Sequence, residues 1–143
     1  MAIFLGLDLG EKRVGVAQSD ETGTIAEARE TLTYKTKEDF LKQLRRVLEE
    51  VRPEKIIVGL PETLRGERGF AAKKVLGLVD WLKERLPAEW VFWDERFTTV
   101  EAERILLEAD LSRRKRRGLR DRLAAQRILQ SYLDAIKNAT QNT

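Results

Sequence analysis

Near the start of the chain, the hydrophobic residues fall into three short runs that are typical of β-strands. The first covers residues 3–9 and is apolar up to Asp8. A second run, over residues 13–19, follows a turn that contains Gly10, and a third, less regular run covers residues 24–33. Because the connections are short, these runs predict a meander of three antiparallel strands.

Further along, the apolar spacing changes to the period of a helix. Apolar side chains recur at three- and four-residue intervals over residues 37–51, and Pro53 ends this helix. A second helix with one apolar face is predicted over residues 69–86. The other expected elements are strands over 55–61 and 90–93, a helix over about 99–109, a basic loop, and a last helix over about 120–137.

The resulting order, βββαβαβαα, predicts an α/β protein. We expect a five-stranded mixed sheet, in which the antiparallel meander is joined by parallel strands and flanked by helices. The order resembles that of ribonuclease H-like folds. No linker or repeat divides the chain, so we expect a single domain over residues 1–138 and a disordered tail over 139–143.

Two absences from the composition narrow the possible chemistry. The chain has no cysteine and no histidine. Disulfides, zinc–thiolate sites, Ser-His-Asp triads and histidine-dependent nucleases are therefore excluded. The apolar start is too short for a signal peptide or a membrane span, so we expect a cytoplasmic protein without membrane contact.

Acidic residues at the ends of predicted elements are the candidates for catalysis. Asp8 ends the first strand, and Asp94 and Glu95 follow the fifth. Because adjacent residues of an extended chain point to opposite faces, only one of that pair can join Asp8. Asp121 lies one turn before the apolar stripe of the last helix and is expected to face the sheet. Alternatively, Asp8 is only a turn residue and Asp121 only stabilises a helix N-terminus.

Carboxylates gathered from three distant segments would repel each other without a cation. Oxygen ligands suit Mg²⁺ or Mn²⁺, and two such ions about 3.5–4 Å apart can promote in-line hydrolysis of a phosphodiester without histidine. The acids therefore predict a two-metal site.

Basic residues are concentrated just before Asp121. Residues 113–122 hold seven basic residues and one acid. The run is either a solvated segment or a contact surface for phosphates, and its position beside a candidate catalytic acid favours the second interpretation. It holds no aromatic residue, so base stacking there is not expected. The expected nucleic-acid contacts are Lys12, Arg13, Arg96, Arg113, Arg114, Lys115, Arg116 and Arg117.

Four motifs, in this order, resemble the YqgF/RuvX family of pre-16S ribosomal RNA nucleases, which are related to the RuvC-type Holliday-junction resolvases. The motifs are Gly6-Leu7-Asp8-Leu9-Gly10, Ile57-Val58-Gly59-Leu60-Pro61, Asp94-Glu95-Arg96-Phe97-Thr98-Thr99 and Asp121-Arg122-Leu123-Ala124-Ala125. The resemblance implies a ribonuclease H-like hydrolase that matures the 5′ end of 16S rRNA. It also implies that Asp8, Glu95 and Asp121 are both the catalytic residues and the metal ligands.

Several alternatives remain beside this hypothesis. One is a Holliday-junction resolvase acting on branched DNA, although we expect a monomer or weak dimer because the predicted helices leave no spare apolar stripe. Another is a non-catalytic RNA-binding protein of ribosome assembly that has kept the acids. An ATP-binding protein of the actin type would need two such lobes, and no GxGxxG motif supports dinucleotide binding.

Overall fold

The structure is a computed structural model that describes residues 2–61, 66–94 and 113–141. Its elements are β1 (Phe4–Leu9), β2 (Arg13–Ser19), β3 (Ala26–Thr33), α1 (Lys37–Val51), β4 (Lys55–Leu60), α2 (Gly66–Arg85), β5 (Trp90–Asp94) and α4 (Arg113–Gln141). The sheet has the order β3-β2-β1-β4-β5. The β1–β2 and β2–β3 pairs are antiparallel, whereas β4 pairs in parallel with both β1 and β5. The predicted mixed sheet is confirmed.

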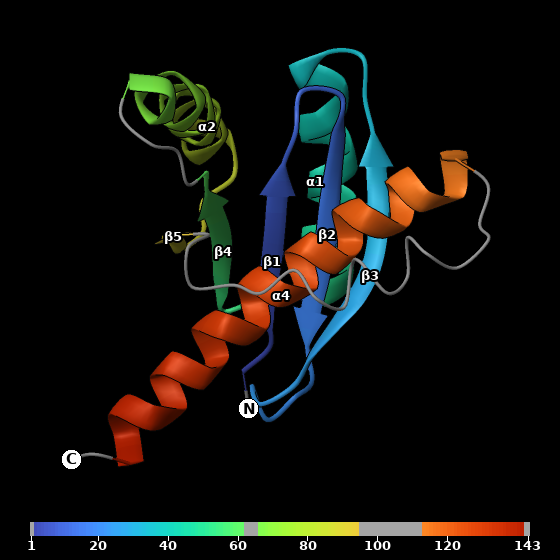
Figure 1. The fold of residues 1–143 in the computed structure, drawn as a ribbon. Helices are drawn as coiled ribbons and strands as arrows, with labels where there is room; N and C mark the ends of the chain where they lie inside the picture. The colour runs from blue at the N-terminus through green and yellow to red at the C-terminus, as the bar shows by residue number, and fades with distance from the viewer. Residues whose placement is uncertain (1, 62–65, 95–112, 142–143) are drawn as a thin grey trace.

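Helices cover both faces of this sheet (Figure 1). One face packs α1 and α2 against Leu5, Leu7 and their neighbours. On the other face α4 crosses β1, β2 and β3 diagonally and buries a smaller cluster that includes Ile128 and Leu129. The long final helix therefore determines what lies next to the strands on that face.

Helix α1 matches its predicted bounds because clear signals mark both of its ends. Thr36 caps the N-terminus by accepting a hydrogen bond from the backbone N–H of Asp39. At the other end, Arg52 adopts a left-handed conformation with φ of 52°, and its N–H bonds to the carbonyl of Leu48. Pro53 follows and cannot continue the helix.

Strand β3 begins at Ala26, two residues later than predicted. The reason is Asp20, whose carboxylate accepts hydrogen bonds from the Thr24 and Ile25 N–H groups and from the Thr22 hydroxyl. These bonds, led by the one from Thr22, lower the pKa of Asp20 to about 2. The preceding turn therefore takes the amides that an earlier start of the strand would have used.

The largest difference from the prediction concerns the last helix. The segment expected to be a basic loop is helical, because α4 begins at Arg113 and not near residue 120. Arginine and lysine are good helix formers, and Gly118 does not interrupt the helix. Residues 139–141, expected in the tail, are also helical because neither glycine nor proline stops α4 there. The helix predicted over 99–109 lies outside the described residues.

Among the described residues, no helix is both long and apolar enough to cross a membrane.

Candidate active site at the end of the sheet

Two of the three predicted acids lie on the same face of the sheet. Gly6 faces α4, since a Cβ there would lie 2.8 Å from the Cβ of Leu129. Asp8 is two residues further along β1 and therefore points to the same face. Its partner across the β1–β2 pair is Gly15, and α4 passes directly over Gly15 at Asp121. The fold thus brings Asp8 and Asp121 together from opposite ends of the chain.

The close approach of α4 to β2 is possible because Gly15 has no side chain. A Cβ at Gly15 would lie 1.8 Å from the carbonyl oxygen of Asp121 and 2.9 Å from the backbone nitrogen of Arg122. Both atoms belong to the backbone, so no rotation of a side chain could make room. Only glycine allows α4 to come this close to β2.

Asp121 makes an ion pair with Arg13, the first residue of β2. The Nε of Arg13 donates a hydrogen bond of 2.6 Å to its Oδ2, and the two residues are 108 positions apart in the sequence. The Asp121 side chain is only 18% exposed, against 38% for Arg13. Since α4 begins at Arg113, Asp121 lies in its third turn. A role limited to stabilising the helix N-terminus is therefore ruled out.

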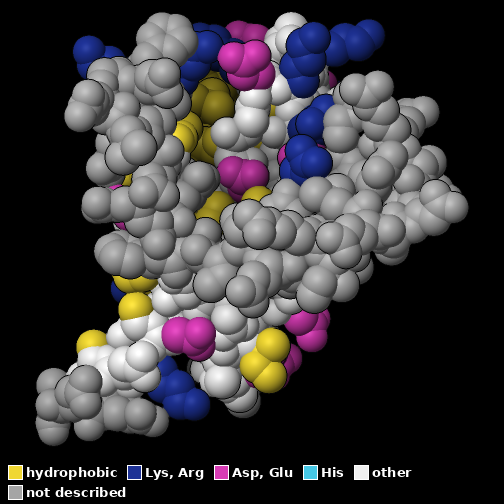
Figure 2. Space-filling model, in the orientation of Figure 1, with side chains coloured by type: hydrophobic (Ala, Val, Ile, Leu, Met, Phe, Trp, Pro, Cys, Tyr) yellow, Lys and Arg dark blue, Asp and Glu magenta, His cyan; other side chains and the backbone are white. Residues whose placement is uncertain are grey.

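A hollow of about 220 Å³ opens beside this ion pair. It is lined by Gly10, Glu11, Lys12, Arg13 and Asp121. The turn between β1 and β2 forms its wall and is held by a 2.9 Å hydrogen bond from the Gly10 N–H to the Arg13 carbonyl. In Figure 2, acidic and basic side chains lie close together at this end of the molecule. Lys12 and Arg13, both predicted to contact nucleic acid, are at this hollow.

Of the two neighbouring acids at the end of β5, the structure describes Asp94 but not Glu95. Asp94 is the last residue of β5, and its side chain points away from the face to which Trp93 points. Trp93 faces α4, because its Nε1 donates a 3.0 Å hydrogen bond to Ser131 of that helix. Asp94 therefore lies on the α1–α2 face, opposite to Asp8. Glu95 and Arg96 lie outside the described residues, so their assignment stays a prediction.

The basic segment is described only as backbone, because the side chains of residues 113–117 lie outside the described part. It forms the first turns of α4, and no acidic residue lies in the first turn. Next to the segment, the Thr31 hydroxyl of β3 donates a hydrogen bond to the Gly118 carbonyl. This bond holds α4 against the edge of the sheet just before Asp121.

Glu11 is a residue of this site that the sequence did not single out. It lines the hollow and forms a 3.0 Å ion pair with Lys74 of α2. Its only sequence signal is its position in the turn after Asp8, and nothing in the pattern predicts a partner 63 residues away.

The fold and the family of this chain can be compared with known proteins. T. thermophilus RuvC in complex with a Holliday junction substrate aligns with a TM-score of 0.62 at 17% identity, over 96% of this chain and 97% of that one. The Fowlpox virus resolvase in complex with Holliday junction DNA aligns with a TM-score of 0.55 at 14% identity, over 94% and 98% of the two chains. At these identities the likeness establishes the fold class alone, which is a ribonuclease H-like fold.

Residues 2–135 match the family described as RuvX, Holliday junction resolvase, and the chain belongs to that family. Relatives from Halothermothrix orenii and Clostridium acetobutylicum, each named "Putative pre-16S rRNA nuclease", are both 44% identical to it. The first alignment covers 92% of this chain and 94% of the relative, and the second 93% and 98%. The chain is accordingly a nuclease, a hydrolase acting on phosphodiester bonds.

Proposed function

We propose that this nuclease hydrolyses a phosphodiester bond of structured RNA during maturation of the 5′ end of pre-16S rRNA in the cytoplasm. Asp8, Glu95 and Asp121 are the catalytic residues in this proposal. The main structural support is that Asp8 and Asp121, from the first strand and the last helix, lie on one face of the sheet at its end. The names of the relatives support the choice of RNA.

The same acids fit a site for divalent cations. Their donors are carboxylate oxygens, which suit Mg²⁺ or Mn²⁺. The Asp121 side chain is mostly buried, and the positive charge next to it comes from Arg13. Among the described residues no group of three potential ligands stands together, and Glu95 would have to supply the third. Two bound ions would supply water activation and stabilisation of the leaving oxygen.

Cationic groups of the chain would position the RNA backbone. Lys12 and Arg13 line the hollow next to Asp121, and the basic first turns of α4 precede Asp121 in the same helix. The N-terminus of α4 adds a partial positive charge that is not cancelled by acids in its first turn. In this arrangement Asp121 would hold a metal ion, and Arg13 would bind a substrate phosphate.

Cleavage of Holliday junctions is the second candidate, and the description of the family favours it. A resolvase has to place two active sites on one junction, which requires a two-fold dimer. The exposed large hydrophobic residues of the described part are Ile25 in the turn before β3, Leu76 on α2 and Ile136 on α4. Such scattered residues do not form a large dimer face, so we propose a monomer or weak dimer.

A substrate comparison tests the proposal. The protein is incubated with a precursor 16S rRNA fragment, single-stranded DNA and a four-way junction, each with Mg²⁺, Mn²⁺ or EDTA. We expect metal-dependent cleavage of the RNA, lost in Asp8→Asn and Asp121→Asn and retained in Asp80→Asn, a control at an exposed position on α2. Paired nicking of junctions without cleavage of the RNA would show the resolvase function instead.

A further inference from the structure

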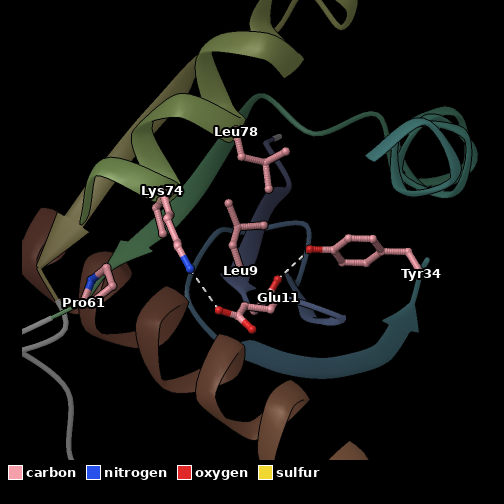
Figure 3. A pocket seen from close by; sticks show the side chains of 8 residues that line it. Leu9, Glu11, Tyr34, Pro61, Lys74 and Leu78 are labelled. Atoms are coloured by element: carbon pink, nitrogen blue, oxygen red, sulfur yellow. Dashed lines mark hydrogen bonds and ion pairs between the residues drawn. The ribbon is translucent and has the colours of Figure 1, made fainter. Parts of the chain in front are cut away.

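A second, larger pocket lies on the other side of the β1–β2 turn (Figure 3). Its volume is about 460 Å³, which is within the size range of ligand sites. The residues that line it in the described part are Leu9, Gly10, Glu11, Tyr34, Pro61, Lys74, Val75 and Leu78.

The pocket adjoins the candidate active site. Gly10 and Glu11 line both the pocket and the hollow beside Asp121. Because side chains alternate along β1, Asp8 faces α4 while Leu9 faces the α1–α2 side, where it lines the pocket. A polymer bound at the carboxylates therefore needs to pass only the β1–β2 turn to reach the pocket.

The lining combines an apolar floor with a polar rim. In Figure 3, Leu78 of α2 points toward Leu9 across the pocket. The rim carries the ion pair of Lys74 and Glu11, whose side chains are 54% and 80% exposed. A nucleobase has the matching character, because its faces are apolar and its edges carry hydrogen-bonding groups.

Tyr34 gives the pocket a fixed aromatic wall. Its hydroxyl donates a 2.6 Å hydrogen bond to the Gly10 carbonyl, and its ring stacks on Phe40 with the centroids 5.0 Å apart. Burial, and then the negative charge of Glu11, raises the pKa of Tyr34, so the hydroxyl stays protonated and keeps donating. The side chain is thus held in place before any ligand binds.

We propose that this pocket binds one unpaired base of the RNA strand, from a nucleotide next to the phosphate held at Asp8 and Asp121. The proposal rests on the nuclease function proposed above. A phosphate fits the pocket less well, because the floor is apolar and the Lys74 ammonium at the rim is already paired with Glu11. The basic segment of residues 113–117 has no aromatic side chain on which a base could stack. This pocket would supply that contact with a base.

Binding of a labelled single-stranded RNA of about twelve nucleotides tests the proposal. Fluorescence anisotropy is measured with Ca²⁺ in place of Mg²⁺ or Mn²⁺, so that a cation can bind the carboxylates while cleavage is suppressed, and one abasic nucleotide is moved along the strand. We expect the abasic nucleotide to weaken binding roughly tenfold at one position and little elsewhere. Leu78→Trp should fill the pocket and remove this position dependence. Leu76→Trp is the matched control, because Leu76 lies on the same helix outside the pocket and is 38% exposed.

The outcomes separate the two proposals. Equal affinity for every abasic strand would overturn the base pocket and leave the nuclease function standing. A position dependence that persists in Leu78→Trp would also overturn it, because the base would then bind elsewhere. If that variant does not fold, Tyr34→Leu removes the aromatic wall and should reduce the abasic penalty. Failure of the unmodified RNA to bind would overturn both proposals.

Discussion

Replacing Gly15 with alanine should damage stability and activity together. The new methyl group would lie 1.8 Å from the Asp121 carbonyl oxygen, whereas ordinary contacts begin near 3.4 Å. Helix α4 must therefore move away from β2 by about 1.6 Å at this point. Overpacking of this kind costs about 1–3 kcal/mol of unfolding free energy. Displacing a catalytic group by about 1 Å can lower the rate about 100-fold.

Two other glycines provide matched controls for the same substitution. Gly6→Ala would bring its methyl group to 2.8 Å from the Leu129 side chain and 3.0 Å from the Ala125 carbonyl, so a smaller loss is expected. A methyl group at Gly77, within α2, would meet nothing within 4 Å. Because alanine favours a helix over glycine, Gly77→Ala should add about 0.5–1 kcal/mol.

Urea denaturation measures these free energies, and the RNA cleavage assay measures the rates. The expected order of stability is Gly77→Ala, wild type, Gly6→Ala, Gly15→Ala. A Gly15→Ala protein with wild-type stability and cleavage would refute the argument, because α4 could not then lie as close to β2 as the structure has it.

Three further changes test the charges of the molecule. In EDTA, Arg13→Met should lower the free energy of unfolding by up to about 1 kcal/mol, because Asp121 loses its partner. Adding Mg²⁺ should restore much of this loss. If urea denaturation shows the same loss with Mg²⁺, metal binding at Asp121 is contradicted. Changing the basic residues of 113–117 to glutamine should make binding less dependent on salt. In salt titrations with RNA and with DNA, the slope of log affinity against log salt should fall by about 0.7–0.9 for each phosphate that the protein no longer binds. Burial would raise the pKa of Glu30, but Arg46 and Arg29 lower it below its ordinary value of 4.5. The ionised Glu30 therefore stabilises the fold above pH 4.5. In denaturation curves, the advantage of the wild type over Glu30→Gln should vanish as the pH falls through the lowered pKa.

Parts of the structure with strong local signals could be predicted from sequence. The bounds of α1 follow from a capping threonine, one apolar stripe and Pro53. The orientation of Asp121 followed from its spacing to Ala125 and Ile128, both of which are buried against the sheet. In each case the residues that carry the signal are within about two turns of the feature that they predict.

Features that depend on distant contacts could not be predicted. The basic start of α4 has no apolar period, so periodicity could not distinguish a helix from a loop there. The Arg13–Asp121 pair joins residues 108 positions apart and depends on how closely α4 approaches Gly15. Glu11 and Lys74 meet only because α2 lies beside the β1–β2 turn.

The alternation of side chains along β1 explains why the proposed phosphate and base sites are separate but adjacent. Asp8 and Leu9 are consecutive residues, so one faces α4 and the other faces α2. Carboxylates that bind cations need polar surroundings, whereas a base needs an apolar floor. If both groups were on one face, each would weaken the other's environment. Placing them on opposite faces at the end of β1 keeps the two environments apart while a single turn, Gly10 to Lys12, borders both. A strand of RNA that crosses this turn would therefore meet both sites with adjacent nucleotides.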